Sequence, residues 1–290
     1  MVVVEHELTE PWEGVLIEPA PGTATGAGVL VLSGSSGRIE RVRARLLAER
    51  GLLALAVRWF GGPGQPPGIC EVPLETFVAA VDLLRERGAH RIGILGTSKG
   101  TEAALLTAVR DPRVDAVVGL SPTSLVWCNL GPGHDGRERP YRSCWSWRGE
   151  PVPFVPMDET WFAELPDTEG PVAVRGSYER SERTFADRLE AAAIPAERAA
   201  ADLLLVAGGD DEMWSSLRYA EELAARRRAA GRPVRVIARH DAGHRVYFPG
   251  EPLPVPSKVF DYGGTARGDG LLGEAAWEPV VDLLTGRRHT

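Results

Sequence analysis

A serine flanked by glycines is the residue of this sequence best placed to do chemistry. Ser98 lies at the centre of a Gly-x-Ser-x-Gly pattern that runs from Gly96 to Gly100. A short apolar run precedes the pattern and a helical period follows it, which predicts a strand, a sharp turn and a helix. Such a turn needs glycine where strand and helix meet, and it exposes the serine hydroxyl. The pattern predicts a nucleophile elbow, with a simple Ser/Gly turn as the alternative.

A serine hydroxyl attacks well only when a base takes its proton and a third group orients that base. One apolar strand pattern continues into Asp210 and Asp211, and a later one continues into His244. Residues that follow parallel strands gather at one edge of the sheet, where sites of α/β proteins lie. We therefore predict a triad of Ser98, Asp211 and His244, in the chain order of the α/β hydrolases.

Each partner of the serine has a rival nearby in the sequence. Asp210 is the alternative acid, although it would also suit a cap on the helix expected from about Ser215. Asp211 is preferred for its spacing from the preceding glycines. His240 is the alternative base, and His244 is preferred because an Ala-Gly pair before it provides a flexible loop.

An acyl-transfer site also needs donors for the oxyanion. The backbone N–H of Lys99, at the start of the helix, is one expected donor. The second is expected from the small-residue loop 33–37, at the N–H of Ser35, with Ser36 as the alternative and as a possible substrate contact. The Lys99 side chain is expected to pair with Glu102 or a neighbouring loop; if it instead met the substrate, a coenzyme A phosphate would suit it.

Strands and helices that could position these residues alternate along the chain. Buried apolar strands between helices are typical of a mostly parallel sheet with helices on both faces. Besides the strand and helix around Ser98, strands are expected at 15–18, 28–32, 52–57, 115–122, 202–207 and 234–238, and helices at 38–50, 74–87, 183–193, 216–230 and 274–284.

The alternation stops between 127 and 184, where Gly, Pro and Trp accumulate. A segment of this kind inside a regular domain is typical of a lid or cap. We therefore expect a single α/β domain over 1–290 with a lid insertion at about 127–184. Trp127 and Trp145, together with Trp214 beside the predicted acid, are candidates to line the acyl part of a substrate. The alternative is that these tryptophans only attach the insertion to the body.

Composition and charge exclude several classes of function. The 290 residues are 43% hydrophobic and carry a net charge of −7, with Lys and Arg dispersed, so no nucleic-acid surface is expected. No apolar run approaches the ~18 residues of a membrane span, and the first residues lack a signal-peptide pattern, so we expect a cytoplasmic protein. Cys70, Cys128 and Cys144 have no metal-ligand spacing, which predicts free thiols, no disulfide framework and no metal site.

Several stretches together resemble the family of acyl-CoA thioester hydrolase and bile acid-CoA:amino acid N-acyltransferase C-terminal domains. The resemblance runs from about Val15 to the C-terminus, and its most specific piece is the Ser-Lys-Gly-x-Glu elbow. The matching stretches are 32–37 with the Glu40 helix after it, 71–77, 96–102, 194–198, 208–214 and 242–244. The resemblance implies an α/β-hydrolase fold, a coenzyme A thioester as substrate, and the roles of nucleophile, acid and base for Ser98, Asp211 and His244.

Two departures from the family pattern bear on function. Animal members similar to this chain carry an additional N-terminal β-sandwich domain, for which we expect no room here, and 130–150 has no close counterpart. In the N-acyltransferase branch the nucleophile is typically cysteine, so Ser98 resembles the hydrolase branch and favours water as acceptor.

The leading hypothesis is a serine thioesterase acting on an acyl-CoA, fatty or polyketide-like, or on an acyl chain held by a carrier protein. It requires no metal or redox cofactor. One alternative is an acyltransferase or cyclase that passes the acyl group to an amine or hydroxyl in a biosynthetic pathway. An esterase or peptidase is another. A binding protein with an inactive site is disfavoured because all three triad residues are present.

Overall fold

The central sheet of the protein is mostly parallel. The structure, a computed structural model, describes residues 2–137, 141–164 and 170–287. Eight strands of this part form one sheet in the order β1-β2-β4-β3-β6-β7-β10-β11, in which β2 pairs antiparallel with β1 and β4 and the other pairs are parallel. The strands are β1 (Val4–Leu8), β2 (Gly14–Glu18), β3 (Ala27–Leu32), β4 (Leu53–Val57), β6 (Arg91–Thr97), β7 (Ala116–Leu120), β10 (Asp202–Gly208) and β11 (Val234–Arg239).

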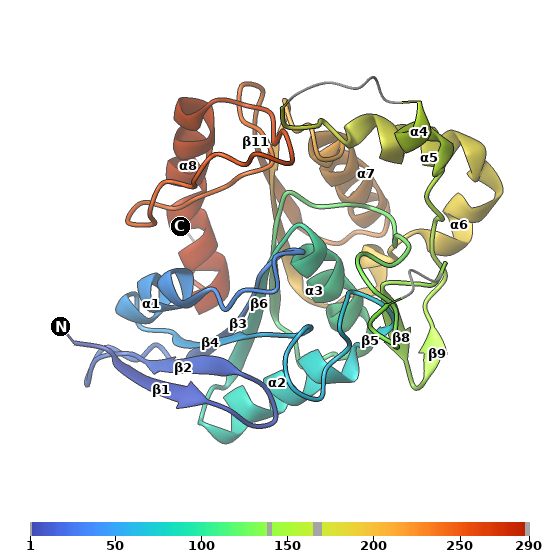
Figure 1. Cartoon of the computed structure of the whole chain (residues 1–290). Helices are drawn as coiled ribbons and strands as arrows, with labels where there is room; N and C mark the ends of the chain where they lie inside the picture. The colour runs from blue at the N-terminus through green and yellow to red at the C-terminus, as the bar shows by residue number, and fades with distance from the viewer. Residues whose placement is uncertain (1, 138–140, 165–169, 288–290) are drawn as a thin grey trace.

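Helices cover both faces of this sheet (Figure 1). One face is covered by α1 (Arg41–Glu49) and α8 (Ala266–Thr285), the other by α2 (Glu75–Glu86), α3 (Lys99–Arg110) and α7 (Ser216–Ala229). Side chains alternate between the faces along each strand. In β3, for example, Val29 and Val31 pack with α1 and α8, whereas Leu30 and Leu32 pack with α2 and α3.

A less regular segment lies between β7 and β10. It contains β8 (Trp145–Trp147) and β9 (Glu150–Pro151), which pair with β5 (Val72–Pro73) in a small second sheet. Its helices are α4 (Thr160–Ala163), α5 (Arg175–Thr184) and α6 (Leu189–Ala192), and 3-10 turns lie at Ala186–Arg188 and Ala196–Arg198. Some of its buried residues, such as Trp127 and Tyr178, form an insertion cluster with Trp214 and Tyr219 of the body, whereas Trp145 belongs to the core that includes α2 and α3. Figure 1 shows α4, α5 and α6 on the same side of the molecule as α7.

The helix expected at 183–193 is present only in part, as the 3-10 turn Ala186–Arg188 and the short α6 that follows it. Helix α5 instead begins at Arg175 and ends at Thr184, because Phe185 leaves helical geometry at φ −112° and ψ 40° and packs into the insertion cluster. The charged residues of α5 hide its helical period in the sequence.

Two further elements differ from expectation. Helix α8 begins at Ala266, eight residues before the expected 274, where the Thr265 side chain caps the Gly268 N–H. Glycines in the first turns of α8 interrupt its apolar helical period, so the sequence pattern does not indicate this start. Strand β1 was not expected, because as a half-exposed edge strand it carries polar residues.

Arg227 fastens α7 to the strands beside it. Its guanidinium is fully buried and donates hydrogen bonds to four backbone carbonyls, those of Ala196, Ala199, Ala201 and Pro233, at 2.8–3.2 Å. Burial lowers the pKa of this arginine. The carbonyls belong to the segments that lead into β10 and β11. One side chain therefore supplies hydrogen-bond donors to the backbone just before both strands.

Arg227→Met should lower the free energy of unfolding by about 3 kcal/mol or more, because it leaves several buried carbonyls without a donor. Urea unfolding followed by circular dichroism measures the difference. Arg228→Met, at an exposed position of the same helix, is the matched control and should change stability by less than about 0.5 kcal/mol. Equal losses in the two variants would contradict this account.

Candidate active site

The turn between β6 and α3 has the strained geometry that the sequence predicts. Ser98 has φ +54° and ψ −118°, a backbone conformation that residues other than glycine rarely adopt. The glycines on either side allow the close packing: a Cβ on Gly96 would lie 2.2 Å from the carbonyl oxygen of Gly100, and a Cβ on Gly100 would lie 2.4 Å from that of Ser33. Both positions therefore exclude any side chain. Ser98 sits at the apex, 9% exposed.

The structure brings Asp211 and His244 together. His244 Nδ1 lies 2.8 Å from Asp211 Oδ2, and both side chains are buried. The second carboxylate oxygen, Oδ1, accepts the backbone N–H groups of Met213 and Trp214 at 2.9 and 3.2 Å. The carboxylate is therefore fixed on one side by its own turn and on the other by the imidazole, which leaves the Nε2 edge of the ring for a reaction.

The two rival residues lie outside this pair. Asp210 is exposed, and its Oδ2 accepts the backbone N–H of Gly264 at 3.1 Å. His240 is exposed at the end of β11. Both rivals follow the same strands as the paired residues, but the loops direct their side chains elsewhere.

Sequence reasoning missed residues that hold His244 in place. Ser121, directly after β7, donates from Oγ to the His244 carbonyl oxygen at 2.7 Å, and the His244 N–H donates to the Tyr262 carbonyl at 2.8 Å. The imidazole lies between the rings of Trp214 and Tyr262, with centroids 5.4 and 5.9 Å away. Position after a buried strand was the available signal for Ser121; nothing local marks Tyr262.

The small-residue loop after β3 lies against the nucleophile. A Cβ on Gly34 would be 3.1 Å from Ser98 Cβ, so the loop backbone touches the serine directly. Ser35 and Ser36 follow at the exposed rim of this loop. Lys99 begins α3, and its backbone N–H belongs to the positive end of the helix dipole. The assignment of Ser35 and Lys99 as oxyanion donors stays a prediction.

The Lys99 side chain is turned into the protein. Its Nζ pairs with Glu102 Oε2 at 2.9 Å, one of the two expected partners, and the two side chains are at most 1% exposed. Burial alone would lower the pKa of Lys99, but the pKa is raised, because nearby Cys144 and the paired Glu102 carboxylate favour the charged ammonium. A coenzyme A phosphate could not meet this ammonium while it is buried.

Two of the three tryptophans expected to line the substrate are packing residues. Glu102 Oε1 accepts the Trp127 backbone N–H at 3.1 Å and the Trp145 indole N–H at 2.8 Å, and both side chains are fully buried. They attach the insertion to α3, so their assignment to the substrate is corrected. Trp214, 2% exposed, packs against His244.

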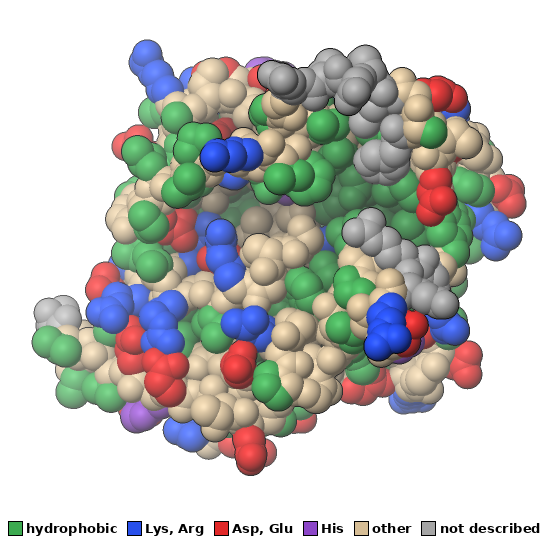
Figure 2. Space-filling model, viewed as in Figure 1, with side chains coloured by type: hydrophobic (Ala, Val, Ile, Leu, Met, Phe, Trp, Pro, Cys, Tyr) green, Lys and Arg blue, Asp and Glu red, His purple; other side chains and the backbone are tan. Residues whose placement is uncertain are grey.

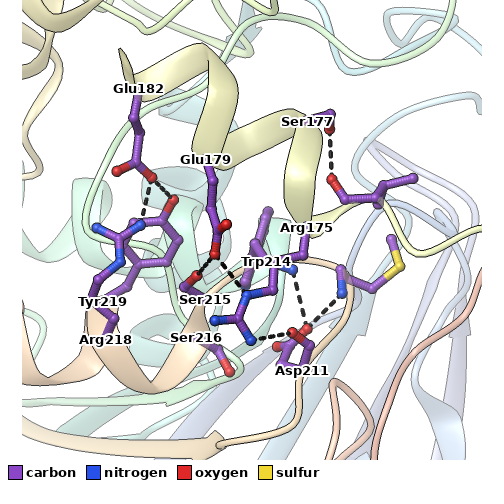
Figure 3. A network of polar contacts seen from close by, with 12 residues as sticks. Arg175, Ser177, Glu179, Glu182, Asp211, Trp214, Ser215, Ser216, Arg218 and Tyr219 are labelled. Carbon is purple, nitrogen blue, oxygen red and sulfur yellow. Dashed lines mark hydrogen bonds and ion pairs between the residues drawn. The ribbon is translucent and has the colours of Figure 1, made fainter. Parts of the chain in front are cut away.

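The insertion is also hydrogen-bonded to the loop that carries Asp211 (Figure 3). The backbone N–H groups of Val174 and Arg175 donate to the Glu212 carbonyl at 2.9 and 2.8 Å. Glu179 of α5 accepts from Arg175 Nε at 2.8 Å and from Ser215 Oγ at 2.9 Å. The Asp211 loop thus depends on the insertion for part of its support.

The face that contains these elements is hollowed beside α3, and hydrophobic side chains line the wall of the hollow (Figure 2). All three cysteines are buried free thiols, and Cys144 Sγ donates to the Cys128 carbonyl at 3.0 Å. In the described part of the chain, no helix is long and apolar enough to cross a membrane, and no three His, Cys, Asp or Glu side chains gather as metal ligands do.

Asp269, in the first turn of α8, supports the loop before the histidine. Its Oδ1 accepts the Gly243 N–H at 2.7 Å, and its side chain is buried. The pKa of Asp269 is raised to about 6. Burial is the largest cause and the Asp211 carboxylate adds to it, whereas the Gly243 hydrogen bond, Arg245 and His244 partly oppose the rise.

Asp269→Asn should be more stable than the wild type, by an amount that grows with pH up to neutrality. A raised carboxyl pKa means that the folded state binds the proton more tightly, so the wild type loses stability as pH rises from about 4 to about 6. The amide keeps an acceptor for Gly243 and does not titrate. Urea unfolding at intervals from pH 4 to 7 measures the difference; one that stays constant or shrinks would contradict the assignment.

Solved structures show which fold this arrangement belongs to. A puromycin-hydrolyzing peptidase from Mycobacterium tuberculosis superposes with a TM-score of 0.58 over 98% of this chain and 39% of its own, at 16% identity. A putative dienelactone hydrolase from Klebsiella pneumoniae does so with a TM-score of 0.50 over 83% of this chain and 86% of its own, also at 16% identity. The chain has the α/β-hydrolase fold that its sequence predicts.

Sequence relatives identify the family. The chain is 26% identical to mouse acyl-coenzyme A amino acid N-acyltransferase 1, over 95% of this chain and 62% of the relative. It is also 26% identical to human acyl-coenzyme A thioesterase 1, over 92% of this chain and 61% of the relative. The chain thus spans about three fifths of the length of these relatives. Since residues 72–287 match the family model described as BAAT / acyl-CoA thioester hydrolase C terminal, the chain belongs to that family.

Proposed function

We propose that this chain is a serine hydrolase that cleaves acyl thioesters, with an acyl-CoA as substrate. The observation that carries the proposal is the strained Ser98 turn at the same sheet edge as the buried Asp211–His244 pair. Thioester chemistry is supported by the names of the relatives, which include acyl-CoA thioesterases. Serine in place of the cysteine typical of the N-acyltransferase branch favours water as the acceptor.

In the proposed first step, Ser98 Oγ attacks the thioester carbonyl while His244 Nε2 takes its proton. Asp211 holds His244 Nδ1 and stabilises the imidazolium that forms. The backbone N–H groups of Lys99 and Ser35 donate to the oxyanion. The C–S bond then breaks, the thiol sulfur leaves with the proton from His244, and the acyl group remains as an ester on Ser98.

Water completes the cycle. His244 takes a proton from a water molecule, whose oxygen attacks the acyl ester, and then returns that proton to Ser98 Oγ as the acid departs. The protein supplies nucleophile, base and oxyanion donors from its own groups, and coenzyme A enters as part of the substrate. An acyl chain on a carrier protein would meet the same groups.

Ser98→Ala should abolish turnover and leave the fold intact. Intact-protein mass spectrometry with a panel of acyl-CoA thioesters and simple esters should detect an acyl adduct that maps to Ser98 in the wild type and is missing from the variant. Circular dichroism is the control for folding. Full activity of Ser98→Ala would exclude the mechanism, and preference for esters would exclude thioesters as the main substrate.

The same assay also distinguishes water from an amine as the acceptor. An amine is worth testing because relatives of the chain are named as amino acid N-acyltransferases. Amino acids are added together with the thioester. Release of free acid alone supports a hydrolase, whereas an N-acyl product would reassign the protein to acyl transfer.

The neighbouring aspartates provide a matched pair of variants. Asp211→Asn should lower kcat by roughly 10³–10⁴-fold, because an amide cannot hold the imidazole in the required tautomer. Asp210→Asn removes a carboxylate one residue away that is exposed, and kcat should stay near the wild-type value. Steady-state kinetics of both variants decides the assignment; the reverse order of effects would make Asp210 the acid.

A further inference from the structure

A buried arginine on α1 forms an ion pair with a glutamate that follows His244 in the chain. Arg43 Nε lies 2.7 Å from Glu251 Oε1, and Nη2 lies 2.9 Å from Oε2, so the pair is bidentate. The side chains are only 5% and 7% exposed. The two residues are separated by 208 positions in the chain, and Glu251 follows the segment that carries His244.

The remaining donors of Arg43 reach both halves of the candidate site. Nη1 donates to Thr97 Oγ1 at 2.8 Å, and Thr97 directly precedes Ser98. Nη2 donates to the Val246 carbonyl at 2.9 Å, two residues after His244. One rigid guanidinium therefore bridges the strand end that carries the nucleophile and the segment that carries the base.

The loop after the base is organised around the same ion pair. Glu251 Oε2 also accepts the Phe248 N–H at 2.7 Å, and the Phe248 ring lies 5.1 Å from Arg43 Cζ. Val246 and Phe248 are themselves buried in the core beneath α8. The segment from His244 to Glu251 is thus held by one charged group at its centre.

Stability alone is a weak explanation for this arrangement. Burying two charges costs free energy that their attraction often only balances, and well-packed apolar residues can replace such a pair without loss. A guanidinium, however, presents donors in a fixed planar fork, which sets the separation of the groups it binds. Four such donor contacts here bind the end of β6 and the 244–251 segment to one guanidinium plane on α1.

We propose that Arg43 is a positioning residue that fixes His244 relative to Ser98. It acts through Thr97 and Val246 and does not touch the substrate. The inference rests on the proposed function, since it assumes that these two residues react together. Misplacement of reacting groups by as little as about 1 Å can cost on the order of 10²-fold in rate.

Thr97→Val tests the elbow side of this bridge without disturbing the ion pair. It removes the one hydrogen bond to Arg43 at nearly constant volume. Arg43→Met removes the whole bridge, and Arg43→Lys keeps the charge but cannot bind Thr97, Val246 and Glu251 together.

Arg50→Met is the control at the end of the same helix, where Arg50 directly follows α1 as its C-cap residue. Arg50 makes a bidentate pair with Glu278 at 2.7 Å and lies over the Trp277 ring. It therefore makes the same kind of ion pair as Arg43, but at a more exposed position and with no bond to Thr97 or Val246.

The first readout is the rate at which a fluorophosphonate probe labels Ser98, which depends on activation of the serine but not on thioester recognition. Labelling should slow about tenfold or more in Thr97→Val and further in Arg43→Met, with partial recovery in Arg43→Lys and wild-type rates in Arg50→Met. Where a thioester is turned over, kcat should fall with KM unchanged, and the pH–rate profile should drop in height without moving its midpoint.

The outcomes separate the two proposals. If wild-type Ser98 does not react with the probe, the proposed function fails. If the wild type reacts and Thr97→Val reacts equally fast, the positioning role fails, whether or not Arg43→Met folds. Thermal unfolding of each variant completes the test. If each variant loses labelling rate only in proportion to the stability that it loses, and Arg50→Met follows the same proportion, then Arg43 has only a structural role.

Discussion

The backbone conformation at Ser98 is the constraint on which the rest of the structure depends. A positive φ at a residue other than glycine costs about 1–3 kcal/mol and persists only where the surroundings enforce it. Here the surroundings are three adjacent strands. Gly96 lies opposite Leu32 in the β3–β6 register, and the Ser98 N–H donates to the Leu120 carbonyl at the end of β7. The sheet register and the close approach of α3 therefore impose the turn together.

Much of the site could be predicted because its residues follow parallel strands. The carboxyl ends of parallel strands meet at one edge, so local patterns around Ser98, Asp211 and His244 were enough to place them near one another. The choice between adjacent aspartates also followed from spacing within a turn. In the structure Asp211 pairs with His244, while Asp210 accepts the Gly264 N–H.

Residues that depend on distant partners could not be predicted in this way. An insertion rich in Gly, Pro and Trp could line a substrate pocket or could simply pack against the body. The contacts with Glu102 show that Trp127 and Trp145 pack against the body. Arg43 sits within an unremarkable charged helix, and its partner Glu251 is far away in the chain. No local period marks such contacts, since they arise when separate elements meet.

The contacts between α5 and the loop that carries Asp211 mean that the insertion cannot be exchanged without an effect on that loop. A replacement segment with a different backbone path would lose the two N–H donors to the Glu212 carbonyl and the Glu179 contact to Ser215. The turn that holds Asp211 would then lose its outer support. A chimera in which the insertion is exchanged would therefore have to keep the 174–179 stretch, because this stretch is structurally part of the turn around Asp211.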